Sequence, residues 1–317
     1  QRQMCIRDRG DLMQHQGQIN AARTSTGYDY STCFAYVKEE IKKADLSIAN
    51  LEVTLGGKPY KGYPAFSAPD EFLTAIHDAG FNVLVTANNH SLDRGKSGLE
   101  RTIQLIDSLK VPHAGTYINA DEREKKYPLL LEKNGFRIAL LNYTYGTNGI
   151  PVTPPNIVNY IDTAIIVKDI EESKAMKPDA IIACMHWGIE YQSLPSKKQK
   201  FLADWLLQKG VDHVIGSHPH VVQPFERDSA GVTLFSLGNF VSNQRKRHTD
   251  GGLLAEIVVT RTAGEPLRYD LEITPVWVLC PGYRILPPEV GDTLAMPAPA
   301  RAAYERFMED TRAHTGL

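Results

Sequence analysis

The chain has 317 residues, of which 42% are hydrophobic, and its formal net charge is −2 at pH 7. This length allows one or two domains of ~100–200 residues with a substantial core, and we expect one large domain. The near-neutral charge gives no global attraction to nucleic acid or to an anionic membrane surface, so no nucleic-acid partner is predicted. Any preference for anions has to be local.

The four cysteines lie far apart and form no C-x-x-C pair, so no disulfide framework is predicted. The chain as given has no run of ~18 apolar residues and no apolar signal-peptide core, so no transmembrane segment is predicted. The first nine residues, QRQMCIRDR, are charged where an apolar strand should precede the Gly-Asp pair that follows. We therefore expect an altered or shortened start, which would also remove a targeting signal.

Apolar periodicity predicts alternating strands and helices along the chain. Helices are expected at 33–44, 71–79, 97–109, 163–176 and 197–209, and strands at 45–48, 82–86, 137–143, 179–185 and 211–215. This alternation is typical of an α/β fold with a largely parallel sheet. Strand-like segments with short connections follow at 232–236, 252–261 and 269–278, which predicts an antiparallel part. Residues 287–299 are Pro-rich and predict a linker to a short surface helix at 300–311.

The most informative segment is GSHPH at 216–220, which places two histidines on alternate residues after a strand-like run. Alternate residues of an extended segment face the same side, and Pro219 favours an extended His218, so both rings are predicted to face one point. This is a chelating geometry, because neutral imidazole is the commonest side-chain metal ligand. Two histidines do not complete a divalent-metal site, so further ligands are expected.

Candidate ligands occur in other segments that are distant in sequence. ANLE at 49–52, NNH at 88–90 and HWG at 186–188 each come directly after a strand-like run, and GDLM begins at Gly10. In an open α/β sheet, ligands bind beyond the carboxyl ends of the strands. These segments are therefore predicted to converge on one site.

In chain order, the motifs GDLM, NLE, NNHSLDRG, HWGIEY, GSHPHVVQ and SLGNF resemble the bacterial CapA family of capsule and poly-γ-glutamate synthesis proteins. That family is similar in fold to the calcineurin-like metallophosphoesterases, and the resemblance extends from about Gly10 to Gly252. It implies an α/β sandwich of two β-sheets flanked by helices over residues 10–285, followed by the Pro-rich linker and terminal helix at 286–317. It also favours the cell envelope, periplasmic or extracellular, and implies other capsule-synthesis proteins as partners.

The resemblance further implies two divalent ions, Mn, Fe or Zn, which together clamp a phosphoryl group and activate a water molecule. Glu52 would bridge the ions, in the place usually held by an aspartate. The other implied ligands are Asp11 and His220 for the first ion, and Asn89, His186 and His218 for the second. Met13 stands where the metallophosphoesterase pattern has a histidine, and His15 is a further ligand if its loop curls back.

The remaining candidates concern catalysis and substrate. His90 would act as a general acid for the leaving group or as a hydrogen-bond donor to the anion, and Asp93 would orient it or begin the next helix. The basic run Arg245, Lys246 and Arg247 would present positive charge to an anionic substrate or polymer, and Asn239 would hydrogen-bond a ligand or the loop backbone. Glu190 and Tyr191 follow HWG and are close in sequence to proposed ligands.

Two classes of function remain open at this point. The first is a metal-dependent hydrolase that acts on a phosphate ester, or with less support on an amide, of an anionic cell-envelope substrate. The second is a non-catalytic accessory protein that holds a polyanionic capsule polymer such as poly-γ-glutamate. The candidate ligands, with a candidate general acid beside them, favour the enzyme.

Overall fold

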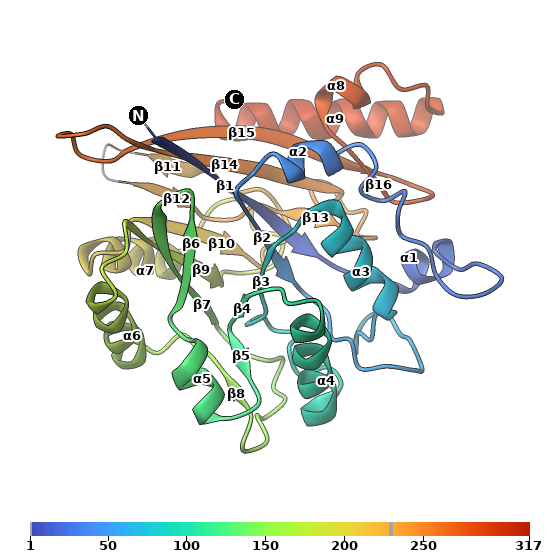
Figure 1. Ribbon diagram of the computed structural model, residues 1–317. Helices are drawn as coiled ribbons and strands as arrows, with labels where there is room; N and C mark the ends of the chain where they lie inside the picture. Colours follow the sequence, from blue (N-terminus) through green and yellow to red (C-terminus); the bar gives the residue numbers. More distant parts are fainter. Residues whose placement is uncertain (1, 228–230) are drawn as a thin grey trace.

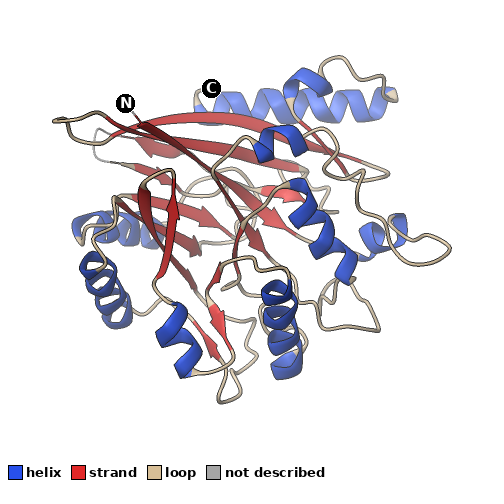
Figure 2. Cartoon of the chain, viewed as in Figure 1, coloured by secondary structure: helices blue, strands red, loops and turns tan. Residues whose placement is uncertain are grey.

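The computed structural model describes residues 2–227 and 231–317, and it contains two large β-sheets with helices on their outer sides (Figures 1 and 2). This architecture is the predicted α/β sandwich. The helices outside the sheets include α1 (Gln16–Ala21), α2 (Lys38–Lys42), α3 (Asp70–Ala79), α4 (Gly95–Ser108), α5 (Ala120–Lys126), α6 (Thr163–Ala175), α7 (Lys197–Gln208), α8 (Pro288–Gly291) and α9 (Ala298–Thr315). Among the described residues, no helix combines the length and the apolar character needed to cross a bilayer.

The first sheet is parallel on one side of β1 and antiparallel on the other. Its strand order is β16 (Arg284–Leu286), β15 (Arg268–Leu279), β14 (Gly251–Arg261), β1 (Arg2–Leu12), β2 (Leu46–Leu51), β3 (Val83–Val85) and β4 (His113–Ala114). The short strand β13 (Asn239–Val241) also pairs with the end of β1, in parallel. The predicted parallel and antiparallel segments are thus joined in one sheet through β1.

The second sheet is also mixed. Its strand order is β11 (Phe225–Arg227), β12 (Val232–Leu234), β10 (His213–Ser217), β9 (Ala180–His186), β7 (Phe136–Thr144) and β6 (Leu129–Lys133). The strands β7, β9, β10 and β12 run parallel, so their carboxyl ends meet at one edge. A small two-stranded sheet is formed by β5 (Thr116–Tyr117) and β8 (Ile157–Val158).

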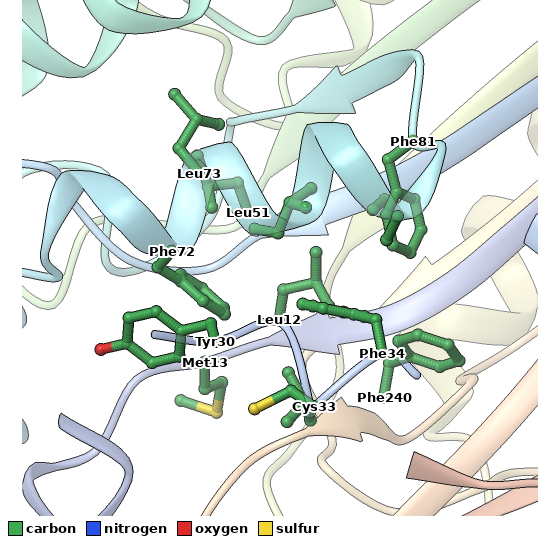
Figure 3. Packing of buried hydrophobic residues seen from close by; sticks show 14 of the residues in the cluster. Leu12, Met13, Tyr30, Cys33, Phe34, Leu51, Phe72, Leu73, Phe81 and Phe240 are labelled. Atoms are coloured by element: carbon green, nitrogen blue, oxygen red, sulfur yellow. The ribbon is translucent and has the colours of Figure 1, made fainter. Parts of the chain in front are cut away.

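Side-chain alternation along the strands builds three layers of core. On β2, Ile48 points between the sheets and packs with residues of β7 and β9, whereas Ala49 and Leu51 point outward. The outward residues join Phe34, Phe72 and other side chains from 30–41 and α3 (Figure 3). A matching outer core packs α6 and α7 on the second sheet. Burial on both faces of the strands holds the sandwich together without a ligand.

The predicted elements agree with the structure except at a few boundaries. The largest difference is at 33–44, where only α2 is helical. Residues before it form successive turns, in which Cys33 N–H donates to Tyr30 O at 3.0 Å and Val37 N–H to Phe34 O at 3.0 Å. These turns bury Phe34 and Val37 at nearly helical spacing, which explains why periodicity suggested one longer helix.

The terminal helix is longer than predicted and is firmly attached. α9 buries Tyr304, Phe307 and Met308 against Trp277 and Leu279 of β15. The Pro-rich segment before it contains α8, which packs on the same strand. The linker prediction for 287–299 therefore missed a short helix.

The charged N-terminal stretch forms a buried strand, β1, although its sequence gave no strand signal. Arg7 pairs with Glu256 and Glu40. Arg9 is 1% exposed, and its Nε and Nη2 have no hydrogen-bond partner among the described residues. Burial lowers the pKa of Arg9 to about 9, although its guanidinium also lies over the rings of Phe81 and Phe240. Strand pairing with β2 and β14 on either side outweighs the unfavourable charge burial.

Replacing Arg9 by methionine should stabilise the protein. Methionine keeps the apolar stem against Phe81 and Phe240 but removes the unpaired nitrogens, and such replacements of buried ionic groups are worth about 1–4 kcal/mol. Chemical denaturation at pH 7 should show a higher free energy of unfolding for Arg9→Met. The exposed Arg268→Met is the matched control and should be neutral; a loss of stability in Arg9→Met would mean that the cation–π contacts dominate.

A second prediction concerns pH. His213 on β10 is fully buried, and burial lowers its pKa from 6.5 to about 4. Between these values the unfolded chain binds a proton that the folded protein does not, so stability falls as pH falls from about 6.5 toward 4. His213→Gln should reduce the stability lost between pH 7 and pH 4.5 by about 2–3 kcal/mol, measured by denaturant unfolding at both pH values. An equal loss in His213→Gln and the exposed His77→Gln would contradict this assignment.

Candidate metal centre

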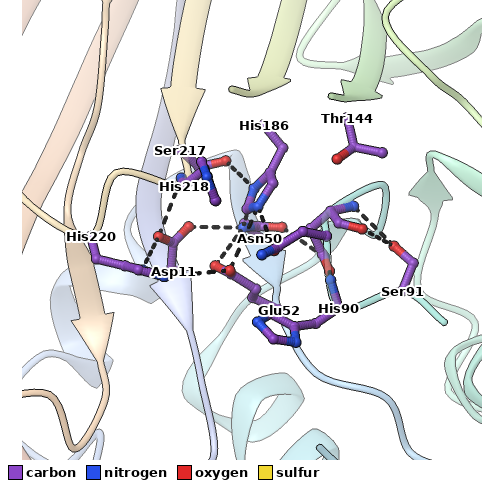
Figure 4. Close-up of polar contacts among 12 residues, drawn as sticks. Asp11, Asn50, Glu52, His90, Ser91, Thr144, His186, Ser217, His218 and His220 are labelled. Carbon is purple, nitrogen blue, oxygen red and sulfur yellow. Dashed lines mark hydrogen bonds and ion pairs between the residues drawn. The ribbon is translucent and has the colours of Figure 1, made fainter. Parts of the chain in front are cut away.

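The predicted ligands converge where strands of both sheets end (Figure 4). Asp11 lies at the end of β1, and Glu52 directly follows β2. His186 is the last residue of β9, and His218 and His220 follow β10. Asn89 follows β3 and joins them, since its Oδ1 lies 2.9 Å from His186 Nε2. The convergence predicted from strand ends is thus present in the structure.

Two groups of ligand atoms share Glu52. Glu52, His186 and His218 form one group, and Asp11, Glu52 and His220 form the other; within each, the ligand atoms lie within 4.8 Å of one another. All five residues are buried. Ligands bound at about 2.1 Å to a common ion are about 3–3.5 Å apart, so small movements would close either group around a cation. Glu52 is the residue common to both groups.

The two carboxylates differ in their electrostatics. Burial and the charge of Asp11 raise the pKa of Glu52 well above its usual value. Burial would also raise the pKa of Asp11, but its hydrogen bond with His220, the charge of His220 and the Asn50 amide outweigh this and lower it. Without a cation, the pair is therefore most stable with Asp11 ionised and Glu52 protonated.

The donor set fits a divalent cation. Burial and the neighbouring histidines lower the pKa of His186 well below 6.5, and burial together with His220 lowers that of His218 to about 3. These imidazoles are therefore neutral at pH 7, which is the form that binds metal. Glu52 Oε1 and His218 Nδ1 are buried and find no hydrogen-bond partner in the described parts of the chain, and a cation would satisfy both. Oxygen and imidazole ligands suit Mn, Fe or Zn.

The backbone at the GSHPH segment is not extended, so that prediction was wrong. β10 ends at Ser217, and His218 and His220 have φ values of +97° and +59°. Such conformations are strained for residues with side chains and persist where the surroundings hold them. Here His218 N–H donates to Asp11 Oδ2 at 3.4 Å, and His220 Nδ1 lies 3.1 Å from the same oxygen. The turn still brings the backbone of His218 and the ring of His220 to Asp11.

Two positioning residues were missed, although both lie inside motifs noted in the sequence. Asn50 Nδ2 donates to Asp11 Oδ1 at 2.8 Å, and its Oδ1 accepts a hydrogen bond from Asn88 at 3.2 Å. Ser217 Oγ lies 2.9 Å from His186 Nδ1 and fixes that ring. In the sequence, Asn50 lies near Glu52 and Ser217 lies directly before His218. Only the fold shows that both side chains contact the cluster. Contacts of this kind orient metal ligands.

His90 lies beside the cluster and is paired with Asp93. Its Nδ1 is 2.8 Å from Asp93 Oδ2, which also accepts the Phe66 backbone N–H at 2.8 Å. The His90 ring packs against the Phe66 ring with a centroid separation of 4.6 Å. Asp93 thus holds one ring nitrogen and leaves Nε2 for another partner, which agrees with the orienting role considered for Asp93.

Of the predicted substrate contacts, the two arginines bond to residues outside the cluster, whereas Asn239 contacts a candidate ligand. Arg245 donates to Val278 O and Ser242 O, and Arg247 forms a two-point ion pair with Asp310 of α9. Asn239 is fully buried, with its Oδ1 3.1 Å from His220 Nδ1 and its Nδ2 bonded to Thr249 O at 2.8 Å. This geometry favours the loop-backbone alternative for Asn239, in which it orients His220.

The two residues singled out near Asp11 lie apart from both ligand groups. Met13 is buried in the core beneath α3. His15 precedes α1, and its Nδ1 accepts the Asn243 N–H at 3.3 Å and contacts Gln18 Oε1 at 3.2 Å. Its loop does not curl back to supply a ligand in this structure.

Exposed side chains surround the buried ligands. The Tyr145 ring, 44% exposed, lies 4.6 Å from the His218 ring, and the Tyr191 ring, 42% exposed, lies 6.2 Å from that of His220. Glu190 is also exposed, and one of its oxygens lies within 4.8 Å of ligand atoms of His218 and His220. We call these exposed groups the rim of the centre. They would contact a molecule that approaches the centre from solvent.

Known proteins match both the sequence and the fold. Residues 8–244 match the family described as Bacterial capsule synthesis protein PGA_cap. "Capsule biosynthesis protein CapA" of Bacillus anthracis is 31% identical over 73% of this chain and 58% of its own length. "PGA biosynthesis protein CapA" of Bacillus subtilis is 30% identical over 70% of this chain and 60% of its own length. The matched region is thus less than two thirds of either relative.

A solved structure supports the fold assignment. The 5′-nucleotidase of Candida albicans superposes with a TM-score of 0.51 over 97% of this chain and 57% of its own, at 12% identity. The fold is therefore that of the calcineurin-like phosphoesterases, as the resemblance implied. Together, the family match and the two CapA relatives show that this chain belongs to the bacterial capsule synthesis family of CapA proteins.

Proposed function

We propose that this protein is a metal-dependent hydrolase that acts on a phosphate ester of an anionic cell-envelope substrate. The observation that carries the proposal is the pair of buried ligand groups that share Glu52. Glu52 Oε1 and His218 Nδ1 are buried with no hydrogen-bond partner among the described residues, which is costly unless a cation completes the arrangement.

Each ligand has an assigned place in this proposal. Asp11 and His220 would hold the first ion, Asn89, His186 and His218 would hold the second, and Glu52 would be shared by both. Two such ions would neutralise phosphoryl oxygens and lower the pKa of the attacking water molecule. Asn50 and Ser217 keep Asp11 and His186 in place through their hydrogen bonds.

His90 supplies the proton for the leaving group in this proposal. With Nδ1–H donated to Asp93, the imidazolium form carries its second proton on Nε2 and can deliver it to the departing oxygen. The Phe66 ring limits the orientations open to the imidazole.

The biological setting is inferred from the relatives. Both are named for capsule or PGA biosynthesis, so we place this protein in capsule or poly-γ-glutamate synthesis, at the cell envelope and with other capsule-synthesis proteins as partners. Residues 10–285 are proposed as the functional domain, with 286–317 as an addition packed on β15. The substrate's anionic character follows from the capsule setting.

Removal of two ligands tests the metal centre. His218→Ala combined with His220→Ala should lower bound Mn, Fe or Zn to near background, since each ligand group then loses a histidine. The fold should remain, because the cores on both sides of the sheets contain neither residue. Metal content by plasma mass spectrometry and circular dichroism measure the two effects, with exposed His77→Ala as control. Unchanged metal content with intact fold would refute the assignment.

Replacement of His90 separates chemistry from coordination. His90→Gln should keep the metal content but lower turnover of a phosphomonoester by about 10²–10⁴-fold, the usual effect of losing a general acid. The loss should be smaller for p-nitrophenyl phosphate than for phenyl phosphate, because a leaving group of low pKa needs less protonation.

The outcomes distinguish the alternatives. Equal losses on both esters would indicate that His90 only donates a hydrogen bond to the anion. No turnover by the metal-loaded parent across phosphoesters and polyglutamate would favour the accessory protein that binds a capsule polymer.

A further inference from the structure

A lysine and a tyrosine from two different loops meet beside the candidate metal centre. Tyr191 lies in the loop after β9, where its backbone N–H donates to Pro219 O at 2.8 Å, and its ring lies 6.2 Å from the ring of His220. Lys246 lies in the loop after β13, and its Nζ is 4.2 Å from the centre of the Tyr191 ring. The Tyr191 ring therefore lies close both to the charge of Lys246 and to the candidate ligand His220.

The loop that carries Lys246 is tied to the same ligand. Thr249 N–H and Oγ1 both donate to Lys246 O, at 3.0 and 2.8 Å. Thr249 O in turn accepts from Asn239 Nδ2, while Asn239 Oδ1 contacts His220 Nδ1. A short chain of hydrogen bonds thus fixes the Lys246 backbone relative to His220.

The C-terminal helix α9 holds both loops from outside. Asp310 accepts two hydrogen bonds from Arg247, at 2.8 and 3.0 Å, and His314 Nε2 lies 2.6 Å from Ser193 O in the Tyr191 loop. Arg245 is directed to Val278 O. Arg245 and Arg247 therefore anchor the loop, whereas the side chain of Lys246 between them does not take part in this anchoring.

Lys246 is exposed. Its side chain contacts the Tyr191 ring and forms no ion pair with any described residue. Glu190 brings a negative charge to the rim, but its oxygen is close to ligand atoms of His218 and His220. The Lys246 ammonium would therefore attract an anion to the side of the Tyr191 ring on which Lys246 lies.

We propose that Tyr191 and Lys246 form a substrate subsite at the rim of the metal centre, which binds a second anionic group, a carboxylate or phosphate, near the scissile ester. The tyrosine ring packs against the carbon atoms that join the two groups, and the ammonium pairs with the charge. This inference rests on the proposed function, and it adds a preference for substrates that carry an extra negative charge.

Two esters that differ in one charge test the subsite. 4-Carboxyphenyl phosphate and its methyl ester should be compared by kcat/KM with the Mn-loaded protein. Lys246→Met should lower the preference for the carboxylate by about two- to five-fold, as expected for one exposed charge pair. Lys246→Arg should retain the preference. Lys168→Met removes another exposed lysine, on α6, and should leave the preference of the parent unchanged.

The result that overturns the inference is an unchanged preference in Lys246→Met. If the parent hydrolyses neither ester, the proposed hydrolase activity fails, and binding of fluorescein-labelled penta-γ-glutamate, measured by anisotropy, decides the subsite separately. Weaker binding by Lys246→Met than by Lys168→Met would then support the subsite. Equal binding, or no binding by the parent, would refute it.

Discussion

Two fully buried carboxylates, Asp11 and Glu52, lie close together where strands of the first sheet end, and the candidate centre depends on how their repulsion is relieved. Burial and the charge of Asp11 raise the pKa of Glu52, so without a cation Glu52 takes up a proton. A divalent ion would replace that proton and allow both carboxylates to ionise. Metal affinity should therefore be linked to pH through Glu52 as well as through the histidines.

The ligand positions depend on close backbone packing against residues 235–239. A Cβ at Gly10 would lie 1.9 Å from Gly238 O, and one at Gly216 would lie 2.0 Å from Phe235 O. Only glycine allows these approaches, and each glycine stands just before candidate ligands, Asp11 in one case and His218 in the other. The backbone of Gly238, within the SLGNF motif, therefore supports the segment that carries Asp11, and the backbone of Phe235, just before the motif, supports the segment that carries His218.

Much of the fold and of the candidate site was predictable, because both depend on patterns along single strands. Apolar runs predicted the strands, and polar residues directly after them predicted the ligands, since parallel strands deliver their carboxyl ends to one edge. β1 was not predictable, because its burial comes from pairing on both sides and its own sequence is charged. The turn at His218 and His220 was also missed, because its positive φ values depend on contacts with Asp11, which is more than 200 residues away.

The substrate-facing charges were predicted only in part. The sequence singled out Arg245, Lys246 and Arg247, but it could not show that the two arginines bond to Val278 of β15 and Asp310 of α9. The metal ligands lie at the ends of strands that are packed in the core. Tyr191 and Lys246 lie instead on loops that hydrogen-bond to α9. Ligands of a metal centre can stay the same while such loops vary, so the choice of substrate should depend on the loops and on the helix that braces them. The C-terminal helix would then take part in function without contacting the centre.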